Sequence, residues 1–366
     1  MKLILFISLL FMPFHASSDI QENNELGIVK TIGKGIFYYP VGPMPMFSYG
    51  SLTVLEERKL IIYDSAGTDP FYIVDVEKEN ITSFGEWGRG PGEFLEDAPK
   101  MISVTESSVY IYDHFSSYLH RYNLDLSFQE TISLDVLTPS LNSVHMYNDS
   151  TMIYSTYNLN TPNTENEYFF NIHAILNGRI NEHFKGLLKL DSIEALRPAK
   201  YNGVLKYGPV VVYDSAIYLA NLFGSIILGL NRNGDIIFQT NAPDQGQIPE
   251  TRPRFLNGIL VGEPETATFR NFDLAIDKDY VYALYSGTSF TFEETSAFMT
   301  GGKIQDDELR IGEANKIRLY DRKDSSYLGE LTLPEYVSAI AADEDYLYGV
   351  VWDNEPHIIV MEKPQL

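Results

Sequence analysis

The sequence predicts an all-β fold, a six-bladed β-propeller made of four-stranded antiparallel blades. The first observation is a unit that recurs six times, in which a polar turn precedes a short apolar run that carries tyrosine. The runs lie at residues 60, 109, 151, 216, 280 and 346. Their spacing fits blades of about 40–50 residues that carry inserted loops. The second observation is the content of 25 tyrosines and 21 phenylalanines, which suits pleated, half-buried strands better than helices.

The strands of the second and fourth units can be placed individually, because apolar runs alternate there with turn residues. In the second unit we expect strands over residues 101–104, 109–113, 118–124 and 127–134. In the fourth unit we expect strands over residues 210–213, 216–221, 225–231 and 235–240. Apolar residues at helical spacing are scarce, and we expect little helix beyond a turn or two near residues 191–196.

Turns and insertions account for the rest of these units. Asn233-Gly234 predicts a tight hairpin, since both central residues of such a turn must accept a positive φ. The segment Asn231–Asp235 also resembles the start of a calcium loop, but no glutamate follows to complete it, and we favour the plain turn. The longer spacings imply inserted loops, which we place at residues 158–167, 241–266 and 291–314.

The sixth unit is one strand short, with strands expected over residues 337–341, 346–352 and 357–362. Three strands would leave an unpaired edge exposed. The run Ile28–Tyr39 precedes the first unit and is rich in β-forming residues. We therefore predict that this N-terminal strand closes the last blade and, with it, the ring.

The N-terminus has the features of an export signal. A positive start, Met1-Lys2, precedes an apolar run over residues 3–14, and Ala16-Ser17-Ser18 offers small residues for cleavage. We predict a signal peptide over residues 1–18 and a single propeller domain over residues 19–366. An uncleaved membrane anchor is the alternative, but the apolar run is short for one. The protein is thus expected to be exported, to the periplasm or the cell exterior, without stable membrane insertion.

Composition narrows the chemistry and the partners. The chain has no cysteine, which excludes a cysteine-linked lipid anchor, disulfides and thiolate zinc sites. Its net charge is −23, so nucleic acid and anionic lipid surfaces are poor partners. Solubility is the simplest explanation of the acidity. We expect a monomer without a cofactor, and a protein, peptide or glycan as its partner.

The most specific segment reads Phe84-Gly85-Glu86-Trp87-Gly88-Arg89-Gly90-Pro91-Gly92-Glu93-Phe94 and is followed by Pro99. It is similar to the opening of an NHL-type propeller repeat. More closely, it resembles the GxGPGEF signature of secreted bacterial six-bladed, TolB-like propellers, and the resemblance is strong over residues 84–134. NHL repeats usually place Asn and Arg after the aspartate of the second strand, where this chain has Ser116-Ser117-Tyr118, so the bacterial branch is the better match.

A structural role is the favoured interpretation of this segment. Phosphate binding is the alternative for a glycine-rich loop, but here the loop opens a strand rather than a helix and lacks the Lys-Ser/Thr ending of a P-loop. We expect an inter-blade loop in which the glycines allow a tight crossing and the phenylalanine fills a gap between adjacent sheets. The residues of this loop are Gly88, Gly90, Pro91, Gly92 and Phe94.

No catalytic motif stands out. The six histidines after residue 18 include no pair at the spacing of a short metal motif, and no G-x-S-x-G sequence is present. Acidic pairs are plentiful, among them Asp277 with Asp279, Asp306 with Asp307, and Asp343 with Asp345. They lie in turns or in an insertion, where solvated loops are the ordinary interpretation. We assign no catalytic residue, no cofactor-binding residue and no metal ligand.

One polar group could bind a ligand. Two arginines stand close together in the long insertion before the fifth blade, in an otherwise acidic chain. With one further arginine and two tyrosines they could form a polar, aromatic mouth for a carboxylate or a sugar. Ion pairs with surface acids are the plainer alternative. The candidate residues are Arg197, Tyr201, Tyr207, Arg252 and Arg254.

Two function hypotheses remain. The first is an exported, non-enzymatic binding or scaffolding propeller that presents loops on one face of a rigid ring, since loops on rigid scaffolds commonly carry binding. The second is a hydrolase or lyase with its site in the central channel, as some propellers of related build imply by resemblance. An enzyme would show convergent polar groups with shifted pKa values in that channel.

Overall fold

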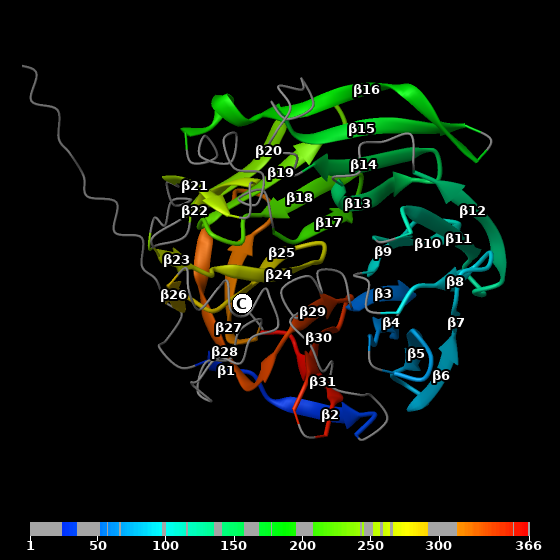
Figure 1. Cartoon of the computed structure of the whole chain (residues 1–366). Coiled ribbons are helices and arrows are strands. Elements are labelled where there is room, and N and C mark those ends of the chain that lie inside the picture. Colours follow the sequence, from blue (N-terminus) through cyan, green and yellow to red (C-terminus); the bar gives the residue numbers. More distant parts are fainter. Residues whose placement is uncertain are drawn as a thin grey trace, which may run out of the picture.

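Six antiparallel sheets account for most of the chain that the computed structural model describes (Figure 1). The described residues are 24–34, 52–56, 58–65, 67–96, 100–114, 116–134, 141–156, 168–176, 178–194, 208–241, 244, 252–256, 259–263, 266–291, 313–353 and 355–364. The predicted signal peptide therefore lies outside them. Within these ranges, no helix is long and apolar enough to span a bilayer.

The first three blades follow one another along the chain. Blade 1 consists of β3 (Leu52–Glu56), β4 (Lys59–Tyr63), β5 (Phe71–Asp75) and β6 (Asn80–Phe84). Blade 2 consists of β9 (Lys100–Val104), β10 (Ser108–Asp113), β11 (Tyr118–Asn123) and β12 (Phe128–Ser133). Blade 3 consists of β13 (Leu141–Asn148), β14 (Thr151–Thr156), β15 (Tyr168–Leu176) and β16 (Arg179–Lys189).

The last three blades complete the ring. Blade 4 consists of β17 (Val210–Tyr213), β18 (Ala216–Ala220), β19 (Ile226–Asn231) and β20 (Ile236–Asn241). Blade 5 consists of β24 (Asn271–Ile276), β25 (Tyr280–Tyr285), β27 (Ala314–Asp321) and β28 (Tyr327–Val337). Blade 6 consists of β29 (Ala339–Ala342), β30 (Tyr346–Val351), β31 (His357–Glu362) and the N-terminal β2 (Ile28–Ile32).

The first strands of the blades contact one another in the closed order β3, β9, β13, β17, β24, β29 and β3 again, so all six surround one axis. The predicted six-bladed, all-β fold is confirmed. The N-terminal closure is confirmed as well, because β2 pairs antiparallel with β31. One residue was assigned to the wrong blade: the first strand of blade 6 begins at Ala339, and Val337 instead ends β28 of blade 5.

Short strands outside the blades add detail that we did not predict. The N-terminal segment also forms β1 (Asn24–Glu25), which pairs parallel with β28 on the rim of blade 5. Within the insertion before blade 5, β21 (Arg252–Leu256) and β22 (Ile259–Glu263) form a hairpin. The segment β23 (Thr266–Thr268) pairs with β26 (Ser289–Thr291). A short 3-10 helix over Leu190–Ser192 lies where a helical turn was expected.

The recurring tyrosines have a common structural reason. Each lies on the second strand of its blade, where its ring is buried, and a buried hydroxyl needs a partner. Tyr282 donates to Asp277 Oδ2 at 2.9 Å, and Tyr348 donates to Asp343. Both aspartates stand in the turn that precedes the strand. In blades 5 and 6 the repeat seen in the sequence is therefore a packed ring whose hydroxyl is tied to the preceding turn.

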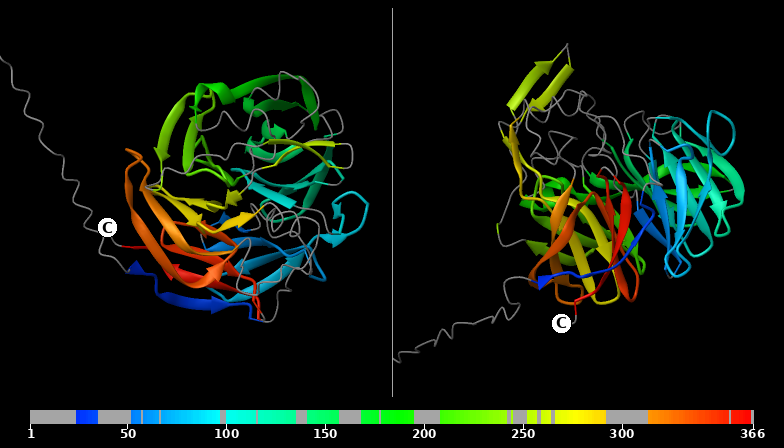
Figure 2. Two further views of the ribbon diagram at one scale, coloured as in Figure 1. Left: turned by 60° about the vertical axis from the view of Figure 1, so that its left-hand side comes forward. Right: turned by 90° about the horizontal axis from the view of Figure 1, so that it is seen from below.

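Connections between strands divide the ring into two faces. Turns from first to second strands and from third to fourth strands lie on one side, which we call the turn face. Connections from second to third strands and from one blade to the next lie on the other side, which we call the insertion face. The β21–β22 hairpin stands away from the ring on that side (Figure 2, right).

Candidate functional site: the axial cavity

A cavity of about 510 Å³ lies on the axis of the ring, and the first strands of all six blades contribute to its wall. This volume falls in the range of small-molecule sites, about 300–1,000 Å³. The wall is largely apolar, with side chains such as Leu52, Ile102 and Ile340. Polar groups from five blades interrupt it, among them Thr53, Ser103, His145, Asp273, Asp277 and Asp343.

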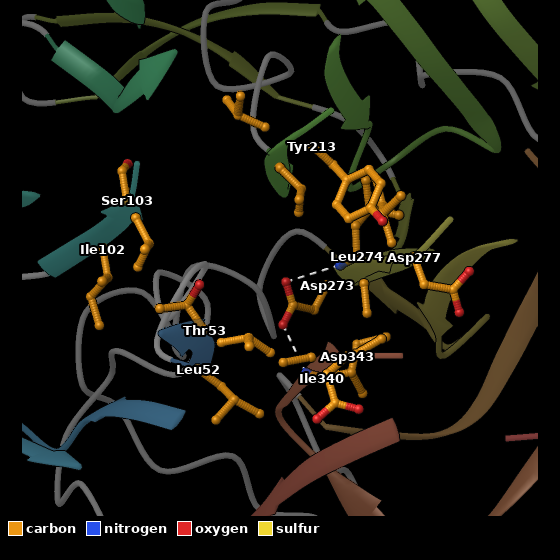
Figure 3. Close-up of a pocket in the computed structure, with 18 of the residues that line it drawn as sticks. Leu52, Thr53, Ile102, Ser103, Tyr213, Asp273, Leu274, Asp277, Ile340 and Asp343 are labelled. Atoms are coloured by element: carbon orange, nitrogen blue, oxygen red, sulfur yellow. Dashed lines mark hydrogen bonds between the residues drawn. The ribbon is translucent and has the colours of Figure 1, made fainter. Parts of the chain in front are cut away.

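Asp273 occupies the centre of this group (Figure 3). It lies on β24, and its side chain is 4 % exposed. One carboxylate oxygen accepts a hydrogen bond from the backbone N–H of Leu274 at 2.9 Å, and the other accepts from Ile340 N at 2.8 Å. The second bond joins the first strands of blades 5 and 6. Asp273 therefore ties two blades together at the axis.

Burial dominates the electrostatics of both titratable groups that line the middle of the cavity. It raises the pKa of Asp273 to about 7, although the two backbone N–H groups oppose the shift by stabilising the carboxylate. It lowers the pKa of His145 to about 4, so this imidazole is neutral at pH 7. A carboxyl group that titrates near neutrality can accept or release a proton. Both oxygens of Asp273, however, already accept bonds from the backbone.

The acidic pairs in the turns act as structural caps. Asp277 Oδ1 accepts from the backbone N–H groups of Asp279 and Tyr280 at 2.7 and 2.8 Å, and Oδ2 accepts from Tyr282. Asp343 repeats this arrangement with Asp345 N and Tyr346 N at 2.9 and 2.8 Å. Lys363 also donates to Asp277 Oδ2, at 2.5 Å. These carboxylates thus stabilise the turns at one end of the cavity; Asp306 and Asp307 lie outside the described residues.

The glycine-rich segment forms a compact loop between blades 1 and 2. Its ends pair as β7 (Glu86–Trp87) and β8 (Glu93–Phe94). The Glu93 carboxylate fills the loop and accepts from Gly90 N at 2.7 Å. A Cβ at Gly88 would lie 2.0 Å from that carboxylate, and Gly92 has φ +78°, so larger residues would strain the loop. Pro91 is exposed between these glycines.

Phe94 is fully buried at the end of this loop. Its ring lies 4.8 Å from that of Phe71 in blade 1 and 4.8 Å from that of His120 in blade 2. Lys100 and Asp113, on the first two strands of blade 2, form an ion pair at 3.4 Å, and both side chains are 0 % exposed. Lys100 also donates to Leu95 O at 2.9 Å. The loop therefore packs an aromatic ring between two blades, and its Leu95 backbone is bonded to a buried ion pair of blade 2.

The arginine and tyrosine candidates are only partly placed. Arg252 and Arg254 lie on β21 of the hairpin above the insertion face, opposite Glu263 and Val261 of β22 in register. Arg197, Tyr201 and Tyr207 lie outside the described residues. The described part of the chain therefore does not bring the five residues together. It places the two arginines on the insertion, apart from the axial cavity.

A polar cluster anchors the base of this insertion. Asp244, between β20 and β21, accepts from Ser225 Oγ at 2.6 Å, from Tyr285 at 3.1 Å and from Arg318 at 3.2 Å, and it pairs with Arg270. Burial raises the pKa of Asp244, but the Ser225 hydroxyl and the Arg318 guanidinium outweigh it and hold the pKa at about 2. The Arg318 guanidinium stacks 3.3 Å above the Tyr285 ring.

Asp273 and His145 were not among the predicted site residues, although the sequence contains a signal for each. Asp273 is the one charged residue in the otherwise apolar run Phe272–Ile276. A charge inside a buried strand usually has a specific partner or function. His145 offers a weaker signal, because its strand mixes polar and apolar residues.

Comparison with known proteins agrees with this fold. Residues 47–217 match a family model described as a 6-bladed beta-propeller. A protein from Bacteroides fragilis whose name describes it as exported has a similar structure, with a TM-score of 0.53 and 12% sequence identity over 94% of this chain and 98% of that one. A member of the DUF4221 family from Bacteroides vulgatus is similar too, with a TM-score of 0.53 and 13% identity over 93% and 99% of the two chains.

At such identities the structural matches show the fold alone. No curated protein matches the chain in sequence. The family match covers blades 1 to 3 and the start of blade 4, and the structure continues the same blade pattern to the end of the ring. The chain is thus a six-bladed β-propeller, and its segment 47–217 is similar to the family that this model describes.

Proposed function

We propose that this protein is an exported binding or scaffolding propeller without a catalytic role, which presents the loops of its insertion face to a protein, peptide or glycan partner. One observation carries the proposal. The connections β14–β15, β20–β24 and β25–β27, which contain the three long insertions, all start and end on the insertion face. Long loops gathered on one face of a rigid scaffold are typical of binding sites.

Anchoring of the largest insertion supports the same proposal. The pairing of β23 with β26 joins the blade 4–5 connection to the β25–β27 connection. The Asp244 cluster fixes the start of that insertion to Arg270 and Arg318 of blade 5. A loop held in place binds with a smaller loss of conformational entropy than a free one. The β21–β22 hairpin, which carries Arg252 and Arg254, is therefore the part we assign to partner contact.

Export to the periplasm or the cell exterior is part of the proposal. The predicted signal peptide supports it, as does the name of the similar Bacteroides fragilis protein. We further propose that the exported chain acts as a monomer. A reporter fused to residues 1–30 should be exported, whereas the same fusion with the apolar run interrupted by two arginines should stay inside the cell.

Partner capture tests the binding site. The exported chain, residues 19–366, is immobilised and exposed to a native envelope extract. We expect an Arg252→Ala, Arg254→Ala double variant to lose the captured species. The matched control is Arg232→Ala with Lys323→Ala, two exposed basic residues in turns on the turn face. Equal capture by the two double variants would refute the role of the hairpin arginines.

The second candidate function is a hydrolase or lyase that acts in the axial cavity. It is favoured by the two buried titratable groups there, Asp273 and His145, whose pKa values are shifted to about 7 and about 4. Asp273→Asn distinguishes the candidates. A binding propeller should capture its partner equally well after this change. An axial enzyme should instead lose its ability to convert a compound present in the envelope extract.

A further inference from the structure

A histidine and two carboxylates from two different blades meet near the insertion face. Glu335 lies near the end of β28 in blade 5, while Asp353 and His357 belong to the β30–β31 connection and the start of β31 in blade 6. One ligand atom from each lies within 4.8 Å of the other two. His357 is 3 % exposed, so its imidazole is held inside the protein rather than in solvent.

The hydrogen bonds of His357 fix which ring nitrogen can bind a cation. Nδ1 lies 2.7 Å from the backbone oxygen of Glu355, which can only accept, so Nδ1 carries the proton. In a neutral ring, Nε2 then has a lone pair and no hydrogen. Nε2 nevertheless faces both oxygens of Glu335, each at 3.3 Å. A nitrogen lone pair that faces a carboxylate needs a positive charge between the two groups, either a proton or a metal ion.

The distances favour a metal ion. A charged N–H···O hydrogen bond to a carboxylate usually measures about 2.7–2.9 Å, shorter than the separations here. Two ligands of a tetrahedral zinc ion, each about 2.1 Å from the metal, lie about 3.4 Å apart. The Asp353 carboxylate is held in a fixed orientation for metal binding, because its Oδ1 accepts a hydrogen bond from Glu355 N at 2.9 Å. A histidine that donates its other nitrogen to a backbone carbonyl is the usual arrangement of a metal ligand.

We propose that Glu335, Asp353 and His357 form a binding site for a divalent transition-metal ion of the zinc class. One imidazole nitrogen and two carboxylate oxygens suit zinc or manganese, whereas calcium and magnesium prefer sites made of oxygen alone. The ion joins β28 of blade 5 to the β30–β31 connection of blade 6. Three protein ligands leave the fourth position of a tetrahedral ion for water or another ligand.

Zinc binding to the exported chain, residues 19–366, tests the site after treatment with a chelator. Calorimetric titration with zinc chloride in a magnesium-containing buffer should show one site. Glu335→Gln and Asp353→Asn should each weaken it at least about 10-fold. The matched control is Asp125→Asn, because Asp125 is also exposed and its Oδ1 also accepts from the backbone N–H two residues on, at 2.9 Å. It should bind zinc as tightly as the unchanged chain.

Two results would overturn the proposal. The first is zinc binding that is absent, or equally tight in all three variants, since the many surface acids would then explain any affinity. The second comes from nitrogen NMR of the His357 ring, a readout that does not depend on affinity. Saturating zinc should shift the Nε2 resonance and leave Nδ1 protonated. If both nitrogens stay protonated under saturating zinc, the cluster is an imidazolium–carboxylate ion pair instead.

Discussion

Replacing Lys100 by methionine tests how the crossing between blades 1 and 2 is held together. The ammonium group and Asp113 are 3.4 Å apart and 0 % exposed. At an effective dielectric constant near 20, two such charges attract by about 5 kcal/mol. Removing one partner leaves the other charge buried without its counter-charge, which typically destabilises a protein by about 3–5 kcal/mol. We expect Lys100→Met to lower the free energy of unfolding by about 4 kcal/mol.

A double-mutant cycle separates the ion pair from the packing around it. Asp113→Asn keeps the shape of the side chain and an oxygen that can accept from Leu95 N, as Asp113 Oδ2 does at 2.9 Å. The double variant should cost less than the sum of the single changes, with a coupling energy of about 2–3 kcal/mol. Unfolding by urea, followed by circular dichroism at pH 7, gives the free energies.

A control fixes the scale of this measurement. Lys59 and Glu56 form an ion pair at 2.7 Å, but their side chains are 38% and 48% exposed. Lys59→Met should therefore cost less than about 1 kcal/mol. The reasoning fails if Lys100→Met is as mild as this control, or if the two changes in the cycle add without coupling.

Three further predictions concern the axis, the inter-blade loop and the closure. Because burial raises the pKa of Asp273 to about 7, the native chain holds a proton that the unfolded chain loses near pH 4. The free energy of unfolding should thus fall by up to about 4 kcal/mol between pH 4 and 7, and Asp273→Asn should flatten that part of a urea-unfolding profile. Phe94→Ala should cost about 3–5 kcal/mol in the same assay, since the ring is fully buried between two blades; a cost below 1 kcal/mol would show that the gap collapses around it. Deleting residues 19–33 should expose the edge of β31 and convert a monomer into aggregates in size-exclusion chromatography, and a stable truncated monomer would contradict closure by β2.

The blades could be predicted because each leaves a local signal. Hairpin turns and alternating runs define strands within about 40–50 residues, and the tyrosines mark the second strand of each unit. Closure by the N-terminal strand could be predicted from the number of strands in each unit, because three strands in the last unit leave one edge unpaired. The pairing of β1 with β28 has no such signal, because β1 consists of only two residues, Asn24 and Glu25, which show no alternation of apolar and polar residues.

Two misses had signals in the sequence. Residues 241–266 were interpreted as a plain loop, yet Asn257-Gly258 separates two β-forming runs, the same turn signal that located the β19–β20 hairpin. The buried ion pair was missed because the first strand of blade 2 was started at Met101. The hairpin register, continued by one residue, places Lys100 directly opposite Asp113.

The functional groups are harder to predict because they depend on how the blades are assembled. Asp273 and His145 come from blades 5 and 3, and only the closed ring brings them to one cavity. Glu335 and His357 are 22 positions apart, but β28 and β31 belong to different sheets, so no spacing motif relates them. Spacing rules for metal ligands describe local loops and helices, not sites between blades.

The junction of blades 5 and 6 carries polar ties at every depth of the ring. At the axis, Asp273 accepts from Ile340 N; on the turn face, Lys363 donates to Asp277; near the insertion face, His357 meets Glu335. On the rim, one N-terminal segment pairs with both blades through β1 and β2. Blade 6 takes three strands from one end of the chain and the fourth from the other, so its place in the ring depends on contacts as much as on chain connectivity. A metal ion between Glu335, Asp353 and His357 would strengthen the one junction whose opening would release both the last blade and the N-terminal strand that closes it.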